Sequence, residues 1–352
     1  MPSSILVINT GSTSLKYKLF DLESFRVLAL NDFAGVENHD EAIKQALREI
    51  GNLSTLVAIG HRVVHGGAEF SEPTEIIKDN IGRLEAYNKL APLHNPYNIA
   101  GIRACLEYLP GIPNIAVFDT AFFKDLPDKA KIYAIPFEFY KEHGIQRFGF
   151  HGISHKFVAQ QAAEKLGKPL SKINLITCHL GGGASITAIR QGKPVDTSMG
   201  YTPLEGLVMM TRPGDIDAGI VLHLKNSMNG NDKGMVSGLL NRTSGIKGIC
   251  GIGDYLDLLE AVKRKDSRAL LAFNIFVYRI QKYLGAYLAI LGGVDAIVFT
   301  GKIGAGKPIT KEKITKNLKV LRGVKILVIP SDEELMIARE VSEALKTGSD
   351  ES

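Results

Sequence analysis

Cysteine is scarce in this chain of 352 residues, which contains three. Cys105, Cys178 and Cys250 lie far apart, and no two of them form a CxxC pair. This spacing speaks against a disulfide scaffold, because disulfide-dense domains carry several cysteines within a short chain. A protein kept in the reducing cytoplasm is expected instead.

A large net charge and a long apolar run are also missing. The chain has 42 basic and 37 acidic residues, a net charge of +5, which is too small to indicate nucleic-acid binding by bulk charge. The most apolar stretch, residues 270–291, contains Arg279, Gln281 and Lys282, so we expect a buried helix rather than a membrane span. The opening MPSSILVINTGS has no basic region followed by an apolar one, and no signal peptide is expected.

Glycine, by contrast, is enriched, with 36 residues or about 10% against about 7% in an average protein. Hydrophobic residues make up 45% of the chain and charged residues 22%, as in an ordinary globular protein. The length predicts about two domains. The glycines cluster beside strand-like segments, where a backbone can approach a ligand closely.

Two similar hairpins are expected half a chain apart. In each, an apolar strand, a glycine turn and an alternating strand follow one another, over residues 5–19 and 175–189, and Gly11 lies 170 positions before Gly181. Further strands are expected at residues 56–59, 115–118, 296–300 and 325–329, and helices at 40–50, 98–108, 267–291 and 332–346. Interleaved strands and helices indicate an α/β fold, and the repeated hairpin indicates two related halves around a shared cleft.

The turns NTGSTS and HLGGGAS are candidate phosphate sites, because turn amides with few side chains in the way form concavities that bind anions. Lys16 follows the first turn on the face of Ser14 and could add a positive charge. A third glycine-rich loop is expected at residues 300–307. Tight hairpins also need glycine for purely structural reasons. No Walker A spacing and no Rossmann fingerprint is present.

Two arginines lie where strands or turns end. Arg62 precedes the Gly66–Gly67 pair, and Arg212 lies in the turn-rich TRPGDID. Guanidinium groups match phosphoryl oxygens with planar, bidentate geometry. The structural alternative for each is an ordinary surface ion pair.

Two HxxxH patterns, His61/His65 and His151/His155, raise the possibility of zinc. In an extended segment, residues four apart are separated by about 13 Å, so the first pair cannot chelate one ion there. The second pair lacks the glutamate of HExxH. A histidine that donates to a charged oxygen is a better interpretation of His151 and His179.

Two acidic residues are candidates for organising a metal ion. Asp119 ends the apolar strand in VFDT, and Glu333 opens the last expected helix. Mg²⁺ in kinases is held by one or two carboxylates and the substrate phosphates. The structural alternatives are a helix or turn cap for Asp119 and a favourable charge in the first helical turn for Glu333.

The motifs together resemble those of acetate kinases. VINTGSTSLKY, GHRVVHGG, PLHNP, VFDTAF, RFGFHGISH, ITCHLGGGASI, VDTSMGYTPLEGL, TRPGDID, AIVFTGKIG and VIPSDEELMIARE occur in the order expected of that family and span nearly the whole chain. The resemblance implies the sugar kinase/Hsp70/actin fold with two duplicated α/β domains. It implies an acceptor-side domain of residues 1–120 plus a terminal helix at about 334–352, and a nucleotide-side domain of residues 121–333.

The resemblance also implies a reaction and partners. Acetate and ATP would be interconverted with acetyl phosphate and ADP, with Mg²⁺ (or Mn²⁺) as the metal ion, in a cytoplasmic homodimer without nucleic-acid or membrane partners. The implied catalytic residues are Arg62, Asp119, His151 and Arg212. The acetate-binding residues would be Arg62, Val64, Leu93 and Pro203, and the metal-associated residues Asn9 and Glu333. The donor-binding residues would be Ser12, Lys16, His179, Gly181, Gly182, Gly183, Asp254, Gly301, Lys302, Ile303 and Gly304.

The donor-side motifs depart from the family pattern at Gly182, Leu256 and Lys302, where that pattern has asparagine, arginine and glycine. Phe123 replaces the histidine that normally ends VFDTAF-type motifs. These departures leave room for pyrophosphate as the phosphoryl donor. Propionate or another short-chain acid is an alternative acceptor, and a non-catalytic nucleotide-binding protein on the same scaffold is the alternative from another class.

Overall fold

The computed structural model describes residues 3–227, 234–316 and 318–349. The chain divides into two compact units. Unit 1 comprises the chain up to Lys124, Phe150–Phe157 and the stretch from Asp332 onward, and unit 2 comprises Asp125–Gly149 and Val158–Ser331. Residues 121–124, 150–157 and 332–333, which the resemblance implies for the second domain, lie in unit 1.

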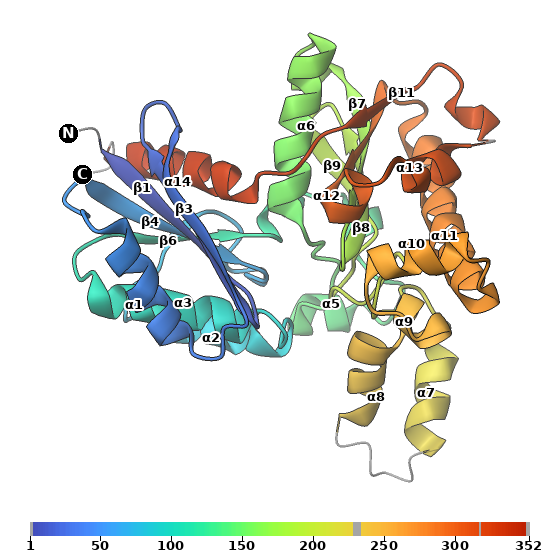
Figure 1. Ribbon diagram of the computed structural model, residues 1–352, viewed down its shortest axis with the longest axis horizontal. Coiled ribbons are helices and arrows are strands. Elements are labelled where there is room, and N and C mark those ends of the chain that lie inside the picture. The colour runs from blue at the N-terminus through green and yellow to red at the C-terminus, as the bar shows by residue number, and fades with distance from the viewer. Residues whose placement is uncertain (1–2, 228–233, 317, 350–352) are drawn as a thin grey trace. The chain divides into compact units, whose positions relative to one another are not determined.

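Unit 1 is built on a mixed sheet with the strand order β3-β2-β1-β4-β6-β5 (Figure 1). Its strands are β1 (Ser4–Thr10), β2 (Ser14–Asp21), β3 (Val27–Ala34), β4 (Leu56–Val63), β5 (Thr74–Glu75) and β6 (Asn114–Phe118). The β1–β2 and β2–β3 pairs are antiparallel, whereas β1–β4 and β4–β6 are parallel. Helices α1 (His39–Ile50) and α3 (Asn95–Tyr108) cover one face, and α14 (Glu333–Ser349) covers the other.

Unit 2 repeats this arrangement with the order β11-β10-β7-β8-β9. Its strands are β7 (Asn174–Leu180), β8 (Ala184–Arg190), β9 (Lys193–Thr197), β10 (Ala296–Thr300) and β11 (Lys325–Val328). Antiparallel β7–β8 and β8–β9 pairs and parallel β10–β7 and β10–β11 pairs reproduce the directions of unit 1. The duplication expected from the hairpins is therefore confirmed by strand order and direction.

The remaining helices belong to the connections. They are α2 (Ile81–Glu85), α4 (Asp128–Lys131), α5 (Glu138–His143), α6 (Gly152–Leu166), α7 (Ala218–Ser227), α8 (Met235–Gly238), α9 (Gly245–Cys250), α10 (Tyr255–Lys263), α11 (Ser267–Leu291), α12 (Gly301–Gly304) and α13 (Pro308–Thr315), with short turns η1 (Ala86–Lys89), η2 (Ala121–Phe123), η3 (Leu170–Lys172), η4 (Leu239–Thr243) and η5 (Lys319–Leu321). None of the helices in the described part of the chain is long and apolar enough to cross a membrane.

Local signals explain the bounds of the longest helix. The side chain of Asp266 accepts a hydrogen bond from the N–H of Ala269 at 2.8 Å, and Gly292 ends α11 with φ 71°. An aspartate cap and a left-handed glycine are common helix boundaries. The expected helix at 267–291 is confirmed, and its apolar face is buried, as at Phe273 and Leu284.

Two expectations about elements near the candidate site are wrong. β4 continues to Val63, so Arg62 lies inside the strand rather than after it. The glycine-rich segment after β10 is not an open loop, because Gly301–Gly304 forms the short helix α12. The sequence also gives no prediction of β3, which alternates between exposed and half-buried residues, or of β9, which contains Pro194.

Candidate active site

The strongest polar cluster of unit 1 surrounds Arg62. Its Nη2 atom lies 2.7 Å from Oδ2 of Asp119, which follows β6, and its Nη1 atom lies 2.9 Å from Oε2 of Glu333, at the start of α14. The structure thus brings three predicted site residues together from three distant parts of the chain. Because β4 and β6 are parallel neighbours, their carboxyl ends meet at one edge of the sheet, where open α/β sheets bind ligands.

Two buried polar atoms of this cluster, one on Asp119 and one on Arg62, have no hydrogen-bond partner among the described residues. Asp119 is 1% exposed; burial raises the pKa of its carboxyl group, and the Arg62 charge opposes that rise. The acidic neighbours outweigh burial and raise the pKa of Arg62. Within the described residues, Oδ1 of Asp119 and Nε of Arg62 are buried without a hydrogen-bond partner. Buried polar atoms without partners cost about 1–3 kcal/mol each, which is consistent with positions that contact a ligand.

A second group of charges lies beside the first. Lys18 on β2 contacts Asp332 at 2.7 Å and Glu334 at 3.4 Å, and the amide of Asn9 on β1 donates to Oε1 of Glu334 at 3.2 Å. Asn9 is thus tied to Glu334 rather than to Glu333. Lys18, Asp332 and Glu334 are not among the predicted site residues, although the run SDEE at the start of the last helix is a usable signal.

His151 lies at the start of α6 with φ 56°, a left-handed conformation that is uncommon outside glycine. The next residue, Gly152, donates its N–H to the carbonyl oxygen of Asp119 at 3.0 Å. A Cβ atom on Gly152 would lie 2.1 Å from that oxygen. The contact requires glycine and fixes the backbone of Asp119 next to that of His151.

The predicted acetate-binding residues fall in both units. Val64 is buried and Leu93 half-buried in unit 1, whereas Pro203 belongs to unit 2. Two asparagines of α3 hold the turn after β4: Asn98 accepts from the N–H of Val64 at 3.2 Å, and Asn95 accepts from the N–H of His65 at 3.0 Å. The motif PLHNPYN contains both, so their role in shaping this turn could have been suspected from the sequence.

Two expected phosphate residues lie at the first hairpin. Ser12 is exposed in the turn, where the N–H of Gly11 donates to the carbonyl of Ser14 at 2.8 Å. Lys16 contacts Asp32 on β3 at 3.0 Å. An exposed pair of this kind is weak and easily exchanged, so Lys16 can turn to a phosphate.

Arg212 is the corresponding cation of unit 2, and its surroundings differ from those of Arg62. Its Nη1 atom donates to the carbonyl of Pro203 at 3.1 Å, and burial lowers its pKa. In the described ranges no carboxylate forms an ion pair with it. A largely buried guanidinium without an anion is a candidate anion-binding group, because a bound anion would offset the desolvation of its charge.

The second hairpin and α12 form the expected donor side. The N–H of Gly181 donates to the carbonyl of Gly183 at 2.9 Å, as Gly11 does in the first hairpin. Half-buried His179 pairs with Thr300 across β7 and β10, and Oγ1 of Thr300 is buried with no hydrogen-bond partner in the part of the chain that the structure describes. Gly301 has φ 78°, and a Cβ there would lie 2.5 Å from the carbonyl of Leu180.

The other donor-side predictions are less centrally placed. Lys302 is exposed in α12, while Ile303 and Gly304 are buried. A Cβ on exposed Gly182 would meet no atom within 4 Å. Asp254 caps α10 by accepting from the N–H groups of Leu256 at 2.7 Å and Asp257 at 3.2 Å, and its donor-binding role stays a prediction.

The chemistry of the donor set in unit 1 fits a hard divalent cation. Asp119, Glu333 and Asn9 offer carboxylate and amide oxygens, and Oδ1 of Asp119 is buried without a partner among the described residues. No group of three or more His, Cys, Asp or Glu side chains that could hold a metal ion by itself occurs in the described ranges. This is compatible with Mg²⁺, which takes one or two carboxylates together with substrate phosphates and water.

The duplicated sheets define the class of protein. Two α/β units whose sheets share the order of five strands form the sugar kinase/Hsp70/actin fold. A solved ROK family transcriptional regulator and a solved putative N-acetylmannosamine kinase of Listeria monocytogenes share this fold, each at 13% identity and a TM-score of 0.50.

The model of the acetokinase family matches residues 30–326. An acetate kinase of Halothermothrix orenii is 44% identical over 397 aligned positions that cover 97% of this chain and 100% of the relative. The acetate kinase structure of Porphyromonas gingivalis is similar with a TM-score of 0.87 and 37% identity, covering 97% of this chain and 100% of that one. A propionate kinase structure of Francisella tularensis is similar with a TM-score of 0.87 and 38% identity, covering 96% and 98%.

The chain therefore belongs to the acetokinase family and is a phosphotransferase with a carboxyl group as acceptor. The alignment of 397 positions exceeds the 352 residues of this chain, so the relative contains residues that are missing here.

Proposed function

We propose that this protein is an acetate kinase, which transfers the γ-phosphoryl group of ATP to acetate and forms acetyl phosphate and ADP. The observation that carries this proposal is the arginine arrangement. Arg62 lies between Asp119 and Glu333 in unit 1, and Arg212 is desolvated without an acidic partner among the described residues of unit 2. Both side chains suit the planar oxygens of a carboxylate or phosphoryl group.

The reaction needs little covalent help from the protein. A carboxylate is already nucleophilic, so no general base is required. In-line phosphoryl transfer instead needs positioning and stabilisation of the charge on the transferring group. In this proposal Arg62, Arg212 and His151 supply that stabilisation, each worth about 3 kcal/mol at the barrier.

The proposed metal ion is Mg²⁺, with Mn²⁺ as a possible substitute. Glu333, Asn9 and Asp119 would hold it, and when bound it would neutralise part of the phosphate charge. Arg62 keeps the carboxylates of Asp119 and Glu333 apart from each other and oriented. Val64, Leu93 and Pro203 would contact the methyl group of acetate.

ATP is the proposed donor, held by the two glycine hairpins and α12. Ser12, Lys16, His179, the glycines 181–183 and residues 301–304 would bind it. Pyrophosphate is the second candidate, favoured by two observations. Leu256, at the position of the family's arginine, is 56% exposed with its apolar side chain, and Lys302 is exposed where the family has glycine.

An assay with acetate, Mg²⁺ and a panel of donors tests these proposals. We expect saturable formation of acetyl phosphate with ATP and none with pyrophosphate. Turnover with pyrophosphate alone would replace the donor, and no acetyl phosphate with any donor would contradict the proposed function. The ratio of kcat/KM for acetate and propionate decides the acceptor, for which the similar propionate kinase structure is the specific alternative.

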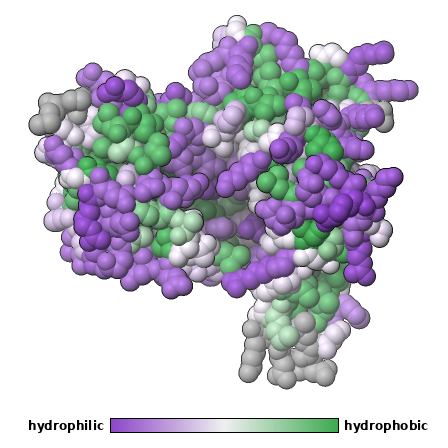
Figure 2. All heavy atoms as spheres, viewed as in Figure 1, coloured by the Kyte–Doolittle hydropathy of each residue, from purple (hydrophilic) through white to green (hydrophobic). Residues whose placement is uncertain are grey.

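We also propose that the protein is a cytoplasmic homodimer. The helix α7 is rich in apolar residues but buries none of them, and Ile220 and Leu222 are 48% and 64% exposed. Figure 2 shows hydrophobic residues gathered over α7 and α8. An exposed apolar patch of this kind is typical of a protein interface. Sedimentation at micromolar concentration is expected to give a dimer, and Leu222→Lys to weaken it.

A further inference from the structure

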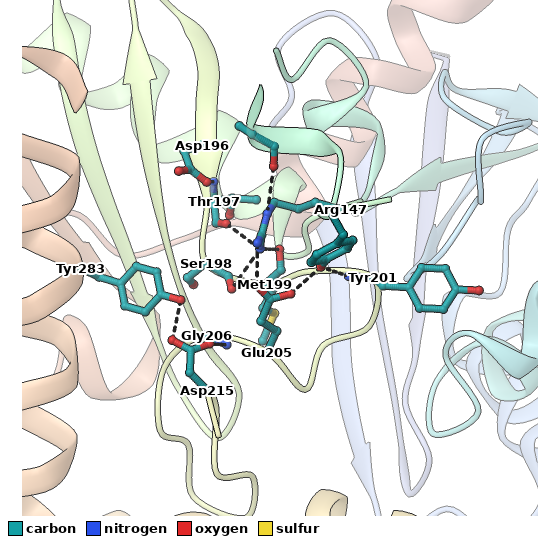
Figure 3. Close-up of polar contacts among 12 residues, drawn as sticks. Arg147, Asp196, Thr197, Ser198, Met199, Tyr201, Glu205, Gly206, Asp215 and Tyr283 are labelled. Carbon is teal, nitrogen blue, oxygen red and sulfur yellow. Dashed lines mark hydrogen bonds and ion pairs between the residues drawn. The ribbon is translucent and has the colours of Figure 1, made fainter. Parts of the chain in front are cut away.

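The segment from Ser198 to Asp217 carries Pro203 and Arg212 but contains no helix or strand. A segment of this length has no backbone ladder to fix its course. Single backbone hydrogen bonds hold parts of it, as where the N–H of Met210 donates to the carbonyl of Gly182 at 3.2 Å and the N–H of Ile246 donates to the carbonyl of Met209 at 3.0 Å. Side chains bind several of its other carbonyl and amide groups. Figure 3 shows that these side chains converge from residues on both sides of the segment in the sequence.

The guanidinium of Arg147 is the centre of this network (Figure 3). Its Nη1 atom donates to the carbonyls of Thr197 and Met199, each at 3.1 Å, and its Nε atom donates to the carbonyl of Ala130 at 3.1 Å. Its Nη2 atom lies 2.5 Å from Oε1 of Glu205. Arginine offers five donors in a rigid fork, and two of these four contacts, to Met199 and Glu205, reach the segment itself.

Glu205 receives a second set of contacts. The hydroxyl of Tyr133 donates to its Oε2 atom, and the N–H of Tyr201 donates to the Tyr133 hydroxyl at 2.9 Å. A Cβ on Gly200 would lie 1.7 Å from Oε2 of Glu205. The carboxylate therefore folds back against Gly200, and the chain from residue 200 to 205 forms a closed loop around it.

This loop carries the carbonyl that orients Arg212. Nη1 of Arg212 donates to the carbonyl of Pro203 at 3.1 Å, and Pro203 lies two residues before Glu205. A second anchor follows Glu205 directly, because Asp215 accepts from the N–H of Gly206 at 2.8 Å and from the hydroxyl of Tyr283 at 2.8 Å. Glu205 thus lies between the anchor at Arg147 and the carbonyl in contact with Arg212.

We propose that Glu205 is a positioning residue for Arg212. Held by Arg147 and Tyr133, it fixes the Pro203 carbonyl, and that carbonyl fixes the guanidinium of Arg212. The consequence for catalysis rests on the proposed function, because it requires Arg212 to act on the transferring phosphoryl group. The placement of the Arg212 guanidinium by Glu205 does not rest on the proposed function.

A double-mutant cycle tests the proposal. Glu205→Gln keeps the size of the side chain but removes the charge that pairs with Arg147. We expect it to lower kcat by about 10–100-fold, because a displacement of about 1 Å costs on the order of 100-fold in rate, with a change in KM for acetate of less than about 3-fold. In an Arg212→Lys background, the same substitution is expected to change kcat by less than about 2-fold.

Asp295→Asn is the matched control. Asp295 is also a carboxylate of unit 2 that accepts from one lysine, Lys168, at 2.8 Å and from the N–H of Asn174 at 2.9 Å. Its side chain is 27% exposed against 31% for Glu205, but it does not contact the segment. The kcat of the Asp295→Asn variant is expected to equal that of the wild-type protein. Tyr133→Phe removes one hydrogen bond to Glu205 and is expected to lower kcat about 5-fold, which keeps the test decisive if Glu205→Gln folds poorly.

A second readout does not need activity. The ¹⁵Nε signal of Arg212, assigned by its loss in Arg212→Lys, is expected to shift or broaden in Glu205→Gln and to stay in place in Asp295→Asn. An unmoved Arg212 signal, or effects of Glu205 and Arg212 that multiply in the cycle, would overturn the inference. A wild-type protein that forms no acetyl phosphate would contradict the proposed function, while the NMR result would still decide the placement of Arg212.

Discussion

Replacement of Gly152 by alanine should move two predicted catalytic residues, Asp119 and His151, away from each other. Gly152 donates its N–H to the carbonyl of Asp119 at 3.0 Å and follows His151, whose φ is 56°. An alanine Cβ would lie 2.1 Å from the Asp119 carbonyl oxygen and 2.8 Å from Cβ of Phe122, whereas ordinary contacts begin at 3.4 Å. The backbones of Asp119 and Gly152 must therefore move apart by more than 1 Å.

The magnitude follows from this displacement. A misplacement of about 1 Å at a reacting group costs on the order of 100-fold in rate, so kcat should fall by about 100-fold. The lost hydrogen bond and the crowding are expected to destabilise the protein by about 1–3 kcal/mol. The lower backbone entropy of alanine in the unfolded chain offsets about 0.4–1 kcal/mol of this.

Steady-state kinetics and urea unfolding on the same preparation measure both effects. The matched control is Gly82→Ala, because Gly82 lies in a helix of unit 1 and a Cβ there meets nothing within 4 Å. It should keep wild-type kcat and gain about 0.5–1 kcal/mol of stability. A Gly152→Ala protein with wild-type kcat would refute the argument that this contact aligns Asp119 with His151.

Three further predictions concern stability and the donor side. Burial lowers the pKa of His61, which contacts Asn114 at 2.8 Å, to about 4. The unfolded chain then binds more protons than the folded chain below about pH 6.5, so this histidine should reduce the free energy of unfolding by about 2 kcal/mol between pH 7 and pH 5. Urea unfolding of His61→Gln should lose this dependence on pH. Gly60→Ala should destabilise the protein by about 1–3 kcal/mol, measured by thermal unfolding, because its Cβ would lie 2.8 Å from a methyl of Ile337 on α14. Gly182→Asn has free space around its Cβ, so the free energy of unfolding should change by less than about 0.5 kcal/mol. The KM for ATP should fall about 5-fold through a new hydrogen bond. An unchanged KM would place Gly182 outside the donor site.

The sequence was sufficient for the parts of the fold that depend on local patterns. The hairpin around Gly11 and its copy around Gly181 follow from apolar strands interrupted by glycine turns, and both are present with the expected spacing. β3 and the extent of β4 were not predictable in this way. An edge strand with half-buried residues lacks an apolar run, and β4 extends past residue 59 because its neighbour β6 offers pairing partners up to Phe118.

The candidate site was predictable where a motif places a charged residue at the end of a strand or the start of a helix. Arg62 contacts both Asp119 and Glu333. The residues that hold such groups in place were missed, because their partners are far away in the sequence. Glu205 contacts Arg147, 58 positions earlier, and Lys18 contacts Asp332, 314 positions later. No local pattern reports pairings of that length.

The duplication gives the last indication of where ligands bind. On β1 and β4, Ile8 pairs with His61, and at the equivalent place on β7 and β10, Cys178 pairs with Phe299. One residue further along lie Arg62 in unit 1 and Thr300 in unit 2. Nε of Arg62 and Oγ1 of Thr300 are both buried without a hydrogen-bond partner in the described residues. Such atoms are rare in folded proteins, and their recurrence at one topological position is not explained by packing, because the two side chains differ in size and charge. Each unit therefore keeps a buried polar atom without a partner among the described residues near the end of its central parallel strand. It is the Nε atom of a guanidinium in one unit and a hydroxyl oxygen in the other, and a ligand can supply the missing partner.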